Sequence, residues 1–234
     1  TEPGNLHLLL ADLEQRLADL EFGMDTDSLK QLVEQNKADY MQLAEEISVI
    51  RKKTAQDLSL KITEIMQTLA MQGGRFEIEL QATNASAQGL DHVQFNVADH
   101  AGTTPRALNK IASGGELARI SLALSVIANK AGQVATLIFD EVDTGIGGGV
   151  AEIVGRLLRQ LGEDHQVLCV THLAQVASCA HHHFEVSKKE QSGTTRSDIR
   201  ALDDEQRIQE IARMLGGLNI SVTTLKHAEE MLKH

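Results

Sequence analysis

The 234-residue sequence contains no tryptophan, one tyrosine and five phenylalanines. A hydrophobic core must therefore be built from leucine, isoleucine, valine and alanine. Only two cysteines are present, too few for a disulfide framework, which favours a reducing cytoplasm. The sequence has no run of about 18 apolar residues that would predict a membrane span, and it shows no recognisable signal peptide. These absences favour a cytoplasmic protein without a membrane partner.

Positive charge is also in short supply. The chain has 33 acidic residues against 22 lysines and arginines, a formal net charge of −11 at pH 7. A chain-wide electrostatic grip on DNA phosphates needs a basic face, which this composition does not provide. The composition still permits a local basic strip that binds DNA, or a partner that supplies such a strip.

A phosphate-binding loop is the third absence. The pattern Gly-x-x-x-x-Gly-Lys-[Ser/Thr], whose amides and lysine hold nucleotide phosphates, does not occur in the sequence. The segment Gly145–Gly149 is glycine-rich, but no lysine follows it. A nucleotide site that uses this chain therefore needs its phosphate-binding loop from elsewhere.

The first 72 residues have the pattern of a coiled-coil arm. Leucines with alternating spacings of four and three predict a helix over about residues 5–21: Leu6, Leu10, Leu13, Leu17 and Leu20. A second helix is expected over about 28–71, where neither proline nor glycine interrupts the apolar stripe. A helix buried within its own globule is the alternative. The length of the helix predicted over 28–71 favours instead an antiparallel coiled-coil arm whose partner lies mostly outside this chain.

Residues 73–234 have a different pattern, which predicts a second domain. Alternating residues over 75–80 and 93–97 predict an antiparallel hairpin. From Ser113 onward, predicted helices alternate with short apolar strands near 134–139 and 166–170. Such strands are typical of an α/β fold with a mostly parallel sheet covered on both faces.

The apolar strand near 134–139 delivers two adjacent carboxylates, Asp140 and Glu141, at its C-terminal end. Ligands bind at this edge of open α/β sheets. In P-loop nucleotide hydrolases an acid in this position holds Mg²⁺, and a neighbouring glutamate can activate water. Taken alone, the pair also fits a solvated strand end.

Two further segments point to the same chemistry. Ser113, Gly114, Gly115 and Glu116 precede a helix, where glycines and the helix dipole favour an anion. A plain helix cap is the alternative interpretation. Thr171-His172 ends the next apolar strand, although a single histidine there is also compatible with a structural role.

The order of these segments is more specific than any one of them. It is similar to the ABC ATPase order of signature motif, Walker B strand, D-loop and switch histidine, and the long first helices indicate the SMC branch. The amino-acid sequences of residues 110–123, 139–146 and 170–177 closely resemble those of the RecN family, which are bacterial SMC-like proteins of recombinational DNA double-strand-break repair. The resemblance is strong from about residue 73 to 217.

The resemblance implies an ATPase that uses ATP and Mg²⁺. Asp140 would hold Mg²⁺, Glu141 would be the catalytic carboxylate, and His172 would contact the γ-phosphate. Ser113 to Gly115, with Glu116, would approach ATP held by a second head in an ATP-dependent homodimer, and Asp143 would lie at that interface.

The same resemblance implies that residues 73–234 are the C-terminal lobe of the ATPase head. The Walker A half would come from an N-terminal lobe outside this chain, so we expect the chain alone to be inactive. DNA would be a partner of the intact protein, and that protein would be associated with the bacterial nucleoid. The alternatives are another SMC-like or ABC ATPase, and a non-enzymatic coiled-coil dimerisation module.

Overall fold

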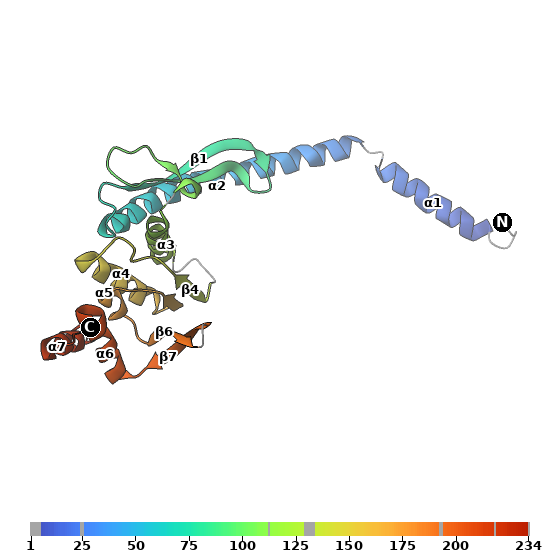
Figure 1. Cartoon of the computed structure of the whole chain (residues 1–234). Helices are drawn as coiled ribbons and strands as arrows, with labels where there is room; N and C mark the ends of the chain where they lie inside the picture. Colours follow the sequence, from blue (N-terminus) through green and yellow to red (C-terminus); the bar gives the residue numbers. More distant parts are fainter. Residues whose placement is uncertain are drawn as a thin grey trace. The chain divides into compact units, whose positions relative to one another are not determined.

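In the computed structural model, residues 6–23, 26–111, 113–128, 134–191, 194–217 and 219–233 are described (Figure 1). The chain forms two compact units. The arm unit contains the residues up to Lys53 together with Ala82–His92, and the head unit contains Thr54–Gln81 and Val93–His234. The long second helix and the first hairpin contribute to both units. The domain division expected at residue 72 stays a prediction.

The arm unit contains the helix α1 (Leu6–Gly23) and the first part of α2 (Thr26–Thr68). Both helices lie close to their predicted positions. The leucines that predicted α1 are all exposed, between 52% and 63% of their surface. The apolar stripe is therefore uncovered within the described part of the chain, as expected of one strand of a coiled coil.

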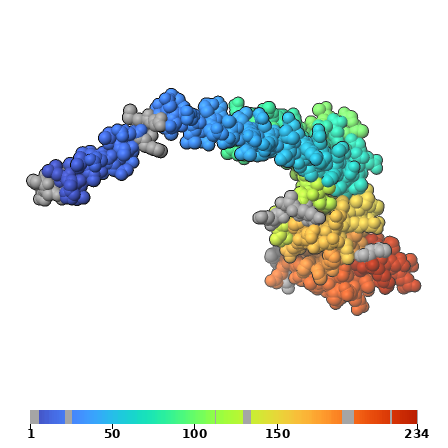
Figure 2. All heavy atoms as spheres, turned by 180° about the vertical axis from the view of Figure 1, so that it is seen from behind, coloured from blue at the N-terminus to red at the C-terminus, as the bar shows by residue number. Residues whose placement is uncertain are grey.

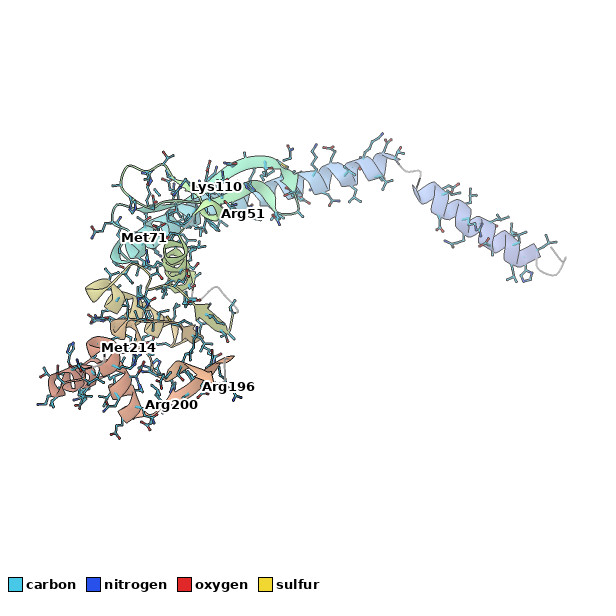
Figure 3. The ribbon with its side chains drawn as sticks, viewed as in Figure 1. Arg51, Met71, Lys110, Arg196, Arg200 and Met214 are labelled. Carbon is cyan, nitrogen blue, oxygen red and sulfur yellow. The ribbon has the colours of Figure 1, made fainter. Side chains whose placement is uncertain are left out.

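The tip of the first hairpin is fastened to α2 in the arm unit. The Tyr40 hydroxyl accepts a hydrogen bond from the Ser86 amide and donates one to the Ser86 carbonyl oxygen, both at 3.0 Å. The Asp91 carboxylate accepts from the Ser48 hydroxyl at 2.6 Å and pairs with Arg51 at 3.4 Å. Arg51 is labelled on α2 in Figure 3. The Ser48 hydrogen bond and the Arg51 charge lower the pKa of Asp91.

Helix α2 ends at Thr68, three residues before the predicted end. Ala70 then has a φ of 60°, in the left-handed region that alanine rarely adopts, and the Met71 amide donates to the Met66 carbonyl oxygen at 3.3 Å. Left-handed residues after a helix commonly satisfy its last carbonyl groups in this way. The chain thus turns before it reaches the glycines at 73 and 74.

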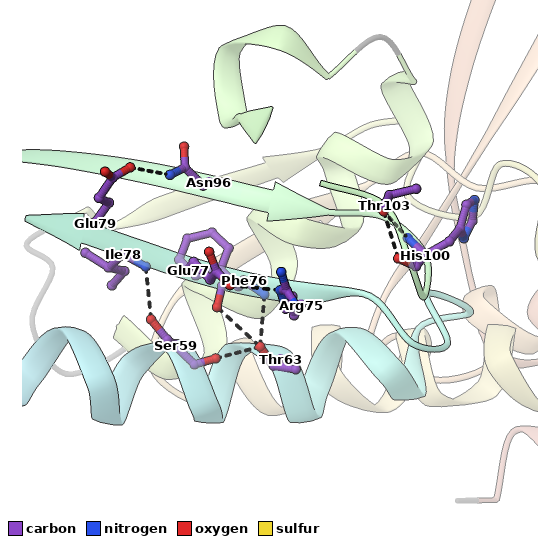
Figure 4. Close-up of polar contacts among 10 residues, drawn as sticks. All are labelled: Ser59, Thr63, Arg75, Phe76, Glu77, Ile78, Glu79, Asn96, His100 and Thr103. Carbon is purple, nitrogen blue, oxygen red and sulfur yellow. Dashed lines mark hydrogen bonds and ion pairs between the residues drawn. The ribbon is translucent and has the colours of Figure 1, made fainter. Parts of the chain in front are cut away.

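The hairpin is confirmed as β1 (Arg75–Ser86) and β2 (Gly89–Ala98), with β3 (Arg106–Ala107) antiparallel to β2. In the head unit, α2 supplies hydroxyl groups to β1 (Figure 4). Thr63 accepts from the Phe76 amide at 2.9 Å, and Ser59 accepts from the Ile78 amide at 3.0 Å. These contacts satisfy two amides on the outer edge of β1, which would otherwise need water or another strand.

After the three-residue 3-10 turn η2 (Leu108–Lys110), the centre of the head unit alternates helices and strands in the predicted order. Helix α3 (Gly114–Ala128) is followed by β4 (Thr136–Phe139), α4 (Gly148–Leu161), β5 (Gln166–Cys169) and α5 (Ala174–Ala177). Strands β4 and β5 are parallel, with Phe139 paired to Cys169. The sequence predicts this helix over about residues 116–131, and the part of that range beyond Ala128 lies outside the described residues.

One face of the β4–β5 pair is open. Leu137 and Phe139 pack in the core, whereas Ile138 is 71% exposed, and on β5 and just after it Leu168 and Val170 are 43% and 62% exposed. A sheet covered on both faces was expected from these apolar strands. The described residues bury one face, and parallel pairing is limited among them to β4 and β5.

The C-terminal part begins with an antiparallel ribbon of β6 (His183–Gln191) and β7 (Thr194–Leu202). Helices α6 (Asp204–Gly216) and α7 (Val222–Met231) follow and pack against each other, and α6 also contacts α5. The atoms of this C-terminal part are orange to red in Figure 2. Asp203 begins α6 with a capping box in which its carboxylate accepts from the Gln206 amide. A small core joins these helices: Ala174, Ile211, Ala212 and Ala228.

The larger core of the head unit joins the end of α2, the base of the hairpin, α3, β4 and α4. Its fully buried members come from all five elements: Ile62, Met66, Leu69, Phe76, Val97, Ile120, Leu122, Phe139, Val154 and Leu161. The last turns of α2 therefore share one packed core with α3 and β4. Among the helices that the structure describes, none is both long and apolar enough to cross a membrane.

Candidate nucleotide-hydrolysis site

Helix α3 begins at the predicted Ser-Gly-Gly-Glu segment. Ser113 precedes the helix and accepts a hydrogen bond on its hydroxyl from the Glu116 amide at 3.4 Å, while its carbonyl oxygen accepts from the Leu117 amide. The long hydroxyl contact makes Ser113 a weak cap. The first turn therefore presents amide groups and the positive end of the helix dipole beside two glycines.

Both glycines lie against the loop that follows β4, which comprises residues 140–147. A methyl group on Gly114 would overlap the Glu141 carboxylate. One on Gly115 would lie 3.1 Å from the Thr144 carbonyl oxygen, tighter than an ordinary contact. The structure thus brings Gly114 and Gly115 to the residues after β4, and the absence of side chains permits this close approach.

Asp140 and Glu141 lie at the C-terminal end of β4, as the sequence predicted, and both are exposed. The Glu141 amide donates to the Asp140 carboxylate at 2.9 Å. Glu141 has a φ of 59°, a left-handed conformation that is unfavourable for a residue with a side chain. Backbone conformations of this kind are concentrated at functional sites.

Thr171 and His172 reach the same loop from β5. The Val170 amide donates to the Phe139 carbonyl oxygen at 2.9 Å, so the parallel pairing continues to the end of both strands. One oxygen of Asp143, Oδ2, then accepts from the Thr171 hydroxyl at 2.5 Å and from the His172 amide at 3.1 Å. His172 Nδ1 lies 3.2 Å from the same oxygen.

Asp143 lies deeper than the resemblance implied. The residue is 2% exposed, and its carboxylate is engaged by Thr171 and His172 of the same chain. Its expected contact with a second head stays a prediction. The His172 side chain, in contrast, is 71% exposed.

Arg119 was not singled out from the sequence as a site residue. Its Nη1 donates to the Thr144 carbonyl oxygen at 2.8 Å, and the residue is only 7% exposed. Burial lowers the pKa of its guanidinium, although the charge of Glu116 acts in the opposite direction. A charged residue on a predicted helix is expected to lie at the surface. Only the helical period, which places Arg119 one turn after Gly115, could have indicated its position.

A separate group of potential metal ligands lies beside the first turn of α3. Carboxylate and imidazole atoms of Asp99, His100 and Glu116 lie within 4.8 Å of one another. Asp99 already accepts from Thr103 at 3.0 Å and pairs with Arg106 at 3.5 Å. The hydrogen bond from Thr103 is the main cause that lowers the pKa of Asp99. This carboxylate is therefore satisfied by its own neighbours.

A shallow, open hollow of about 380 Å³ lies between α3 and β4. Gly114, Leu117, Ile138 and Asp140 are among the residues that line it. The predicted site residues on the two elements thus share one recess, with apolar side chains along one part and the Asp140 carboxylate along another.

Comparison with known proteins identifies the family. The chain is 48% identical over 197 residues to the DNA repair protein RecN of Xylella fastidiosa. It is 45% identical over 195 residues to RecN of Vibrio cholerae and 34% identical over 222 residues to RecN of Bacillus subtilis. The chain belongs to the RecN family.

These RecN matches cover 82% to 88% of this chain but only 35% to 38% of the relatives. The chain therefore spans little more than a third of the length of the RecN proteins it matches. No family model matches the sequence.

The fold also agrees with that of SMC heads. A crystal structure of the Smc head domain with a coiled coil and joint from Pyrococcus yayanosii is similar, with a TM-score of 0.53 and 20% identity. The match covers 86% of this chain and 37% of that structure. The RecN-family chain thus has the α/β architecture of an SMC-type ATPase head preceded by a long helix.

Proposed function

We propose that this RecN-family chain forms the C-terminal lobe of a Mg²⁺-dependent ATPase head in recombinational repair of DNA double-strand breaks. It supplies the signature motif, the Walker B acid, the catalytic glutamate and the switch histidine. A separate N-terminal lobe supplies the Walker A loop, which the printed sequence lacks.

One observation carries this proposal: three segments far apart in the sequence meet at the loop after β4. Gly114 and Gly115 touch Glu141 and Thr144 of that loop. Thr171 and His172 bind Asp143 of the same loop. A plain helix cap and a solvated strand end would not require this convergence.

The chemistry of each group fits ATP hydrolysis. Asp140 is exposed at a strand end and keeps one carboxylate oxygen free of the Glu141 amide, which suits a Mg²⁺ ligand. When bound, Mg²⁺ would neutralise charge on the phosphates. Glu141 would orient or deprotonate water, and His172 would contact the γ-phosphate through its exposed imidazole.

The start of α3 would serve a second nucleotide. Ser113, Gly114, Gly115 and Glu116 would face ATP held by the other head of an ATP-dependent homodimer. Amide groups at a helix N-terminus favour a phosphate, and glycines let it approach closely. ATP would thus bring two heads together, and hydrolysis would let them open and change their engagement of DNA.

The uncovered apolar faces support the missing N-terminal lobe as a partner. Six large apolar side chains on the head unit are between 43% and 71% exposed: Ile138, Leu168, Val170, Phe184, Val186 and Ile199. Ile138 and Leu168 are paired across β4 and β5, and Val186 and Ile199 across β6 and β7, so each set lies on one sheet face. Exposed apolar surfaces of this kind mark interaction sites.

The test uses a complete RecN-family protein that joins this chain to a Walker A lobe. We expect Mg²⁺-dependent ATP hydrolysis that Glu141→Gln abolishes, because the amide cannot take a proton from water. Glu152→Gln on an exposed face of α4 is the matched control and should retain turnover. The 234-residue chain alone should be inactive.

Three results would contradict parts of the proposal. A complete protein without ATPase activity would favour the alternative of a non-enzymatic coiled-coil dimerisation module, which the exposed leucines of α1 also suit. Turnover by this chain alone would contradict the requirement for a separate Walker A lobe. If activity is present, cells that carry Glu141→Gln should be sensitive to double-strand breaks. Normal repair would instead favour another SMC-like or ABC task.

A further inference from the structure

We propose that Asp143 is a positioning residue for the switch histidine of its own chain. It fixes the ring orientation and the tautomer of His172, so that Nε2 is the nitrogen presented to the nucleotide. This inference rests on the proposed function for its consequence in catalysis. Its structural part concerns Asp143 and His172 alone and can be tested without nucleotide.

The His172 side chain is held by Asp143 on its Nδ1 side, while most of its surface is exposed to solvent. Asp143 Oδ2 receives the His172 amide at 3.1 Å and lies 3.2 Å from His172 Nδ1. The Asp143 side chain is 3% exposed, whereas that of His172 is 71% exposed. An exposed imidazole without such a contact exchanges between rotamers, and each rotamer would present different atoms to a ligand.

The contact also selects one tautomer. A carboxylate oxygen offers only lone pairs, so an unprotonated Nδ1 at 3.2 Å would set a second lone pair against it. A proton on Nδ1 is therefore the favourable state. In the neutral ring, Nε2 then has a lone pair and becomes a donor only after protonation. Asp143 therefore determines which ring nitrogen can take up a proton during the reaction.

Thr171 holds the carboxylate in place for this task. Its hydroxyl donates to Asp143 Oδ2 at 2.5 Å and accepts from the Leu173 amide at 3.1 Å. The Leu173 carbonyl oxygen, a second acceptor for the hydroxyl proton, lies further away at 3.5 Å, so Asp143 Oδ2 is the main partner of that proton. A network in which each buried group has a partner confines the carboxylate to one orientation.

The tautomer is measured by nitrogen NMR of the histidine rings in the 234-residue chain, at alkaline pH where histidines are neutral. His172→Gln assigns the signal. We expect Nδ1 to be protonated in the wild type and Asp143→Asn to shift the ring towards the Nε2-protonated form, because an amide can donate to Nδ1. Thr171→Val keeps the carboxylate as acceptor and should retain the wild-type tautomer.

Backbone amide spectra of each variant check that the fold is intact. If Asp143→Asn does not fold, the wild-type and Thr171→Val spectra still decide the tautomer. An Nε2-protonated His172 in the wild type overturns the inference. So does a ring signal that is the same in a folded Asp143→Asn variant.

The catalytic consequence is measured in the complete protein. Asp143→Asn should lower kcat about tenfold or more with little change in KM, as expected when a partner that orients a functional histidine is lost. Combined with His172→Gln, it should cause no further loss, because both changes act through one imidazole.

Additive losses would overturn the inference, because Asp143 would then act independently of His172, for instance on a second head. A wild-type complete protein without ATPase activity would instead refute the proposed function. The tautomer measurement would still decide the role of Asp143.

Discussion

Arg119, on the second turn of α3, donates a hydrogen bond from Nη1 to the main-chain oxygen of Thr144 at 2.8 Å. The Nε of the same guanidinium is buried and has no hydrogen-bond partner within the part of the chain that the structure describes. Arg119 thus joins α3 to the loop after β4 and leaves one buried donor without a partner among the described residues.

We expect Arg119→Lys to reduce the free energy of unfolding by about 1–2 kcal/mol, since lysine cannot reproduce the guanidinium contact and leaves the Thr144 oxygen without a donor. Urea denaturation followed by circular dichroism measures the change. Arg156→Lys is the matched control, because Arg156 forms an exposed pair with Glu152 on α4. Its effect should stay within about 0.5 kcal/mol. Equal effects of the two substitutions would contradict a bracing role for Arg119.

The left-handed backbone at Glu141 predicts a conflict between stability and activity. Glu141→Gly should raise the free energy of unfolding by about 0.5–1 kcal/mol relative to Glu141→Gln, because glycine adopts a φ of 59° without steric strain. Both variants should lack ATPase activity in the complete protein. Ala70→Gly provides the comparison, since Ala70 has a φ of 60° but no proposed catalytic role. A Glu141→Gly variant less stable than Glu141→Gln would contradict strain at this position.

Cys169 should be unreactive despite its position beside the site. Burial, followed by the charges of Asp143 and Asp140, raises its pKa to about 12. At pH 8 almost no thiolate is present, so alkylation by iodoacetamide should be slow in the folded chain and fast in urea. Mass spectrometry of the labelled peptide measures the rate. Rapid labelling of the native protein at pH 8 would contradict the expected protection.

The raised pKa of Cys169 predicts that the free energy of unfolding falls at alkaline pH. The pKa of Cys169 is higher in the folded state than its ordinary value of 9.0. Its contribution to stability is therefore complete below pH 9 and is lost as the pH rises towards 12. Cys169→Ala should remove this part of the decline in denaturation experiments between those pH values.

His183 should make the fold more sensitive to acid. Its Nε2 donates to the Ala177 carbonyl oxygen at 2.7 Å, and burial, with the charge of Arg207, lowers its pKa below the ordinary 6.5. The unfolded chain therefore binds more protons just below pH 6.5, so stability falls as the pH drops through that value. His183→Gln should flatten the decline between pH 7 and the lowered pKa, whereas His181→Gln on the exposed neighbour is the control. A decline that is unchanged in His183→Gln would contradict the assignment.

The sequence predicted most helices and strands because their boundaries carry local signals. Ser113 and two glycines precede a helix, and alternating residues such as Phe76 and Ile78 identify the hairpin. The end of α2 was less predictable, because an alanine in the left-handed conformation has no sequence signature. The open face of β4 and β5 was not predicted either, since a strand waiting for a separate partner has the same apolar composition as a strand covered within its own chain.

The site was predictable in part for similar reasons. The order of Ser113, Asp140 and His172 indicated which side chains belong together. It did not indicate that Asp143 is buried or that Arg119 reaches Thr144, because both contacts depend on how the loop after β4 folds back. Charged residues give no local signal that distinguishes a buried contact from a solvated one.

Asp143 and Thr144 are consecutive residues, and this adjacency makes the loop after β4 a mechanical link. Thr144 is held by Arg119 of α3, and Asp143 is held by Thr171 and His172. Consecutive Cα atoms are about 3.8 Å apart and cannot separate. A displacement of α3 would therefore pull on His172 through this loop. In the head dimer proposed above, a phosphate at the start of α3 would thus be coupled to the histidine proposed to contact the other nucleotide.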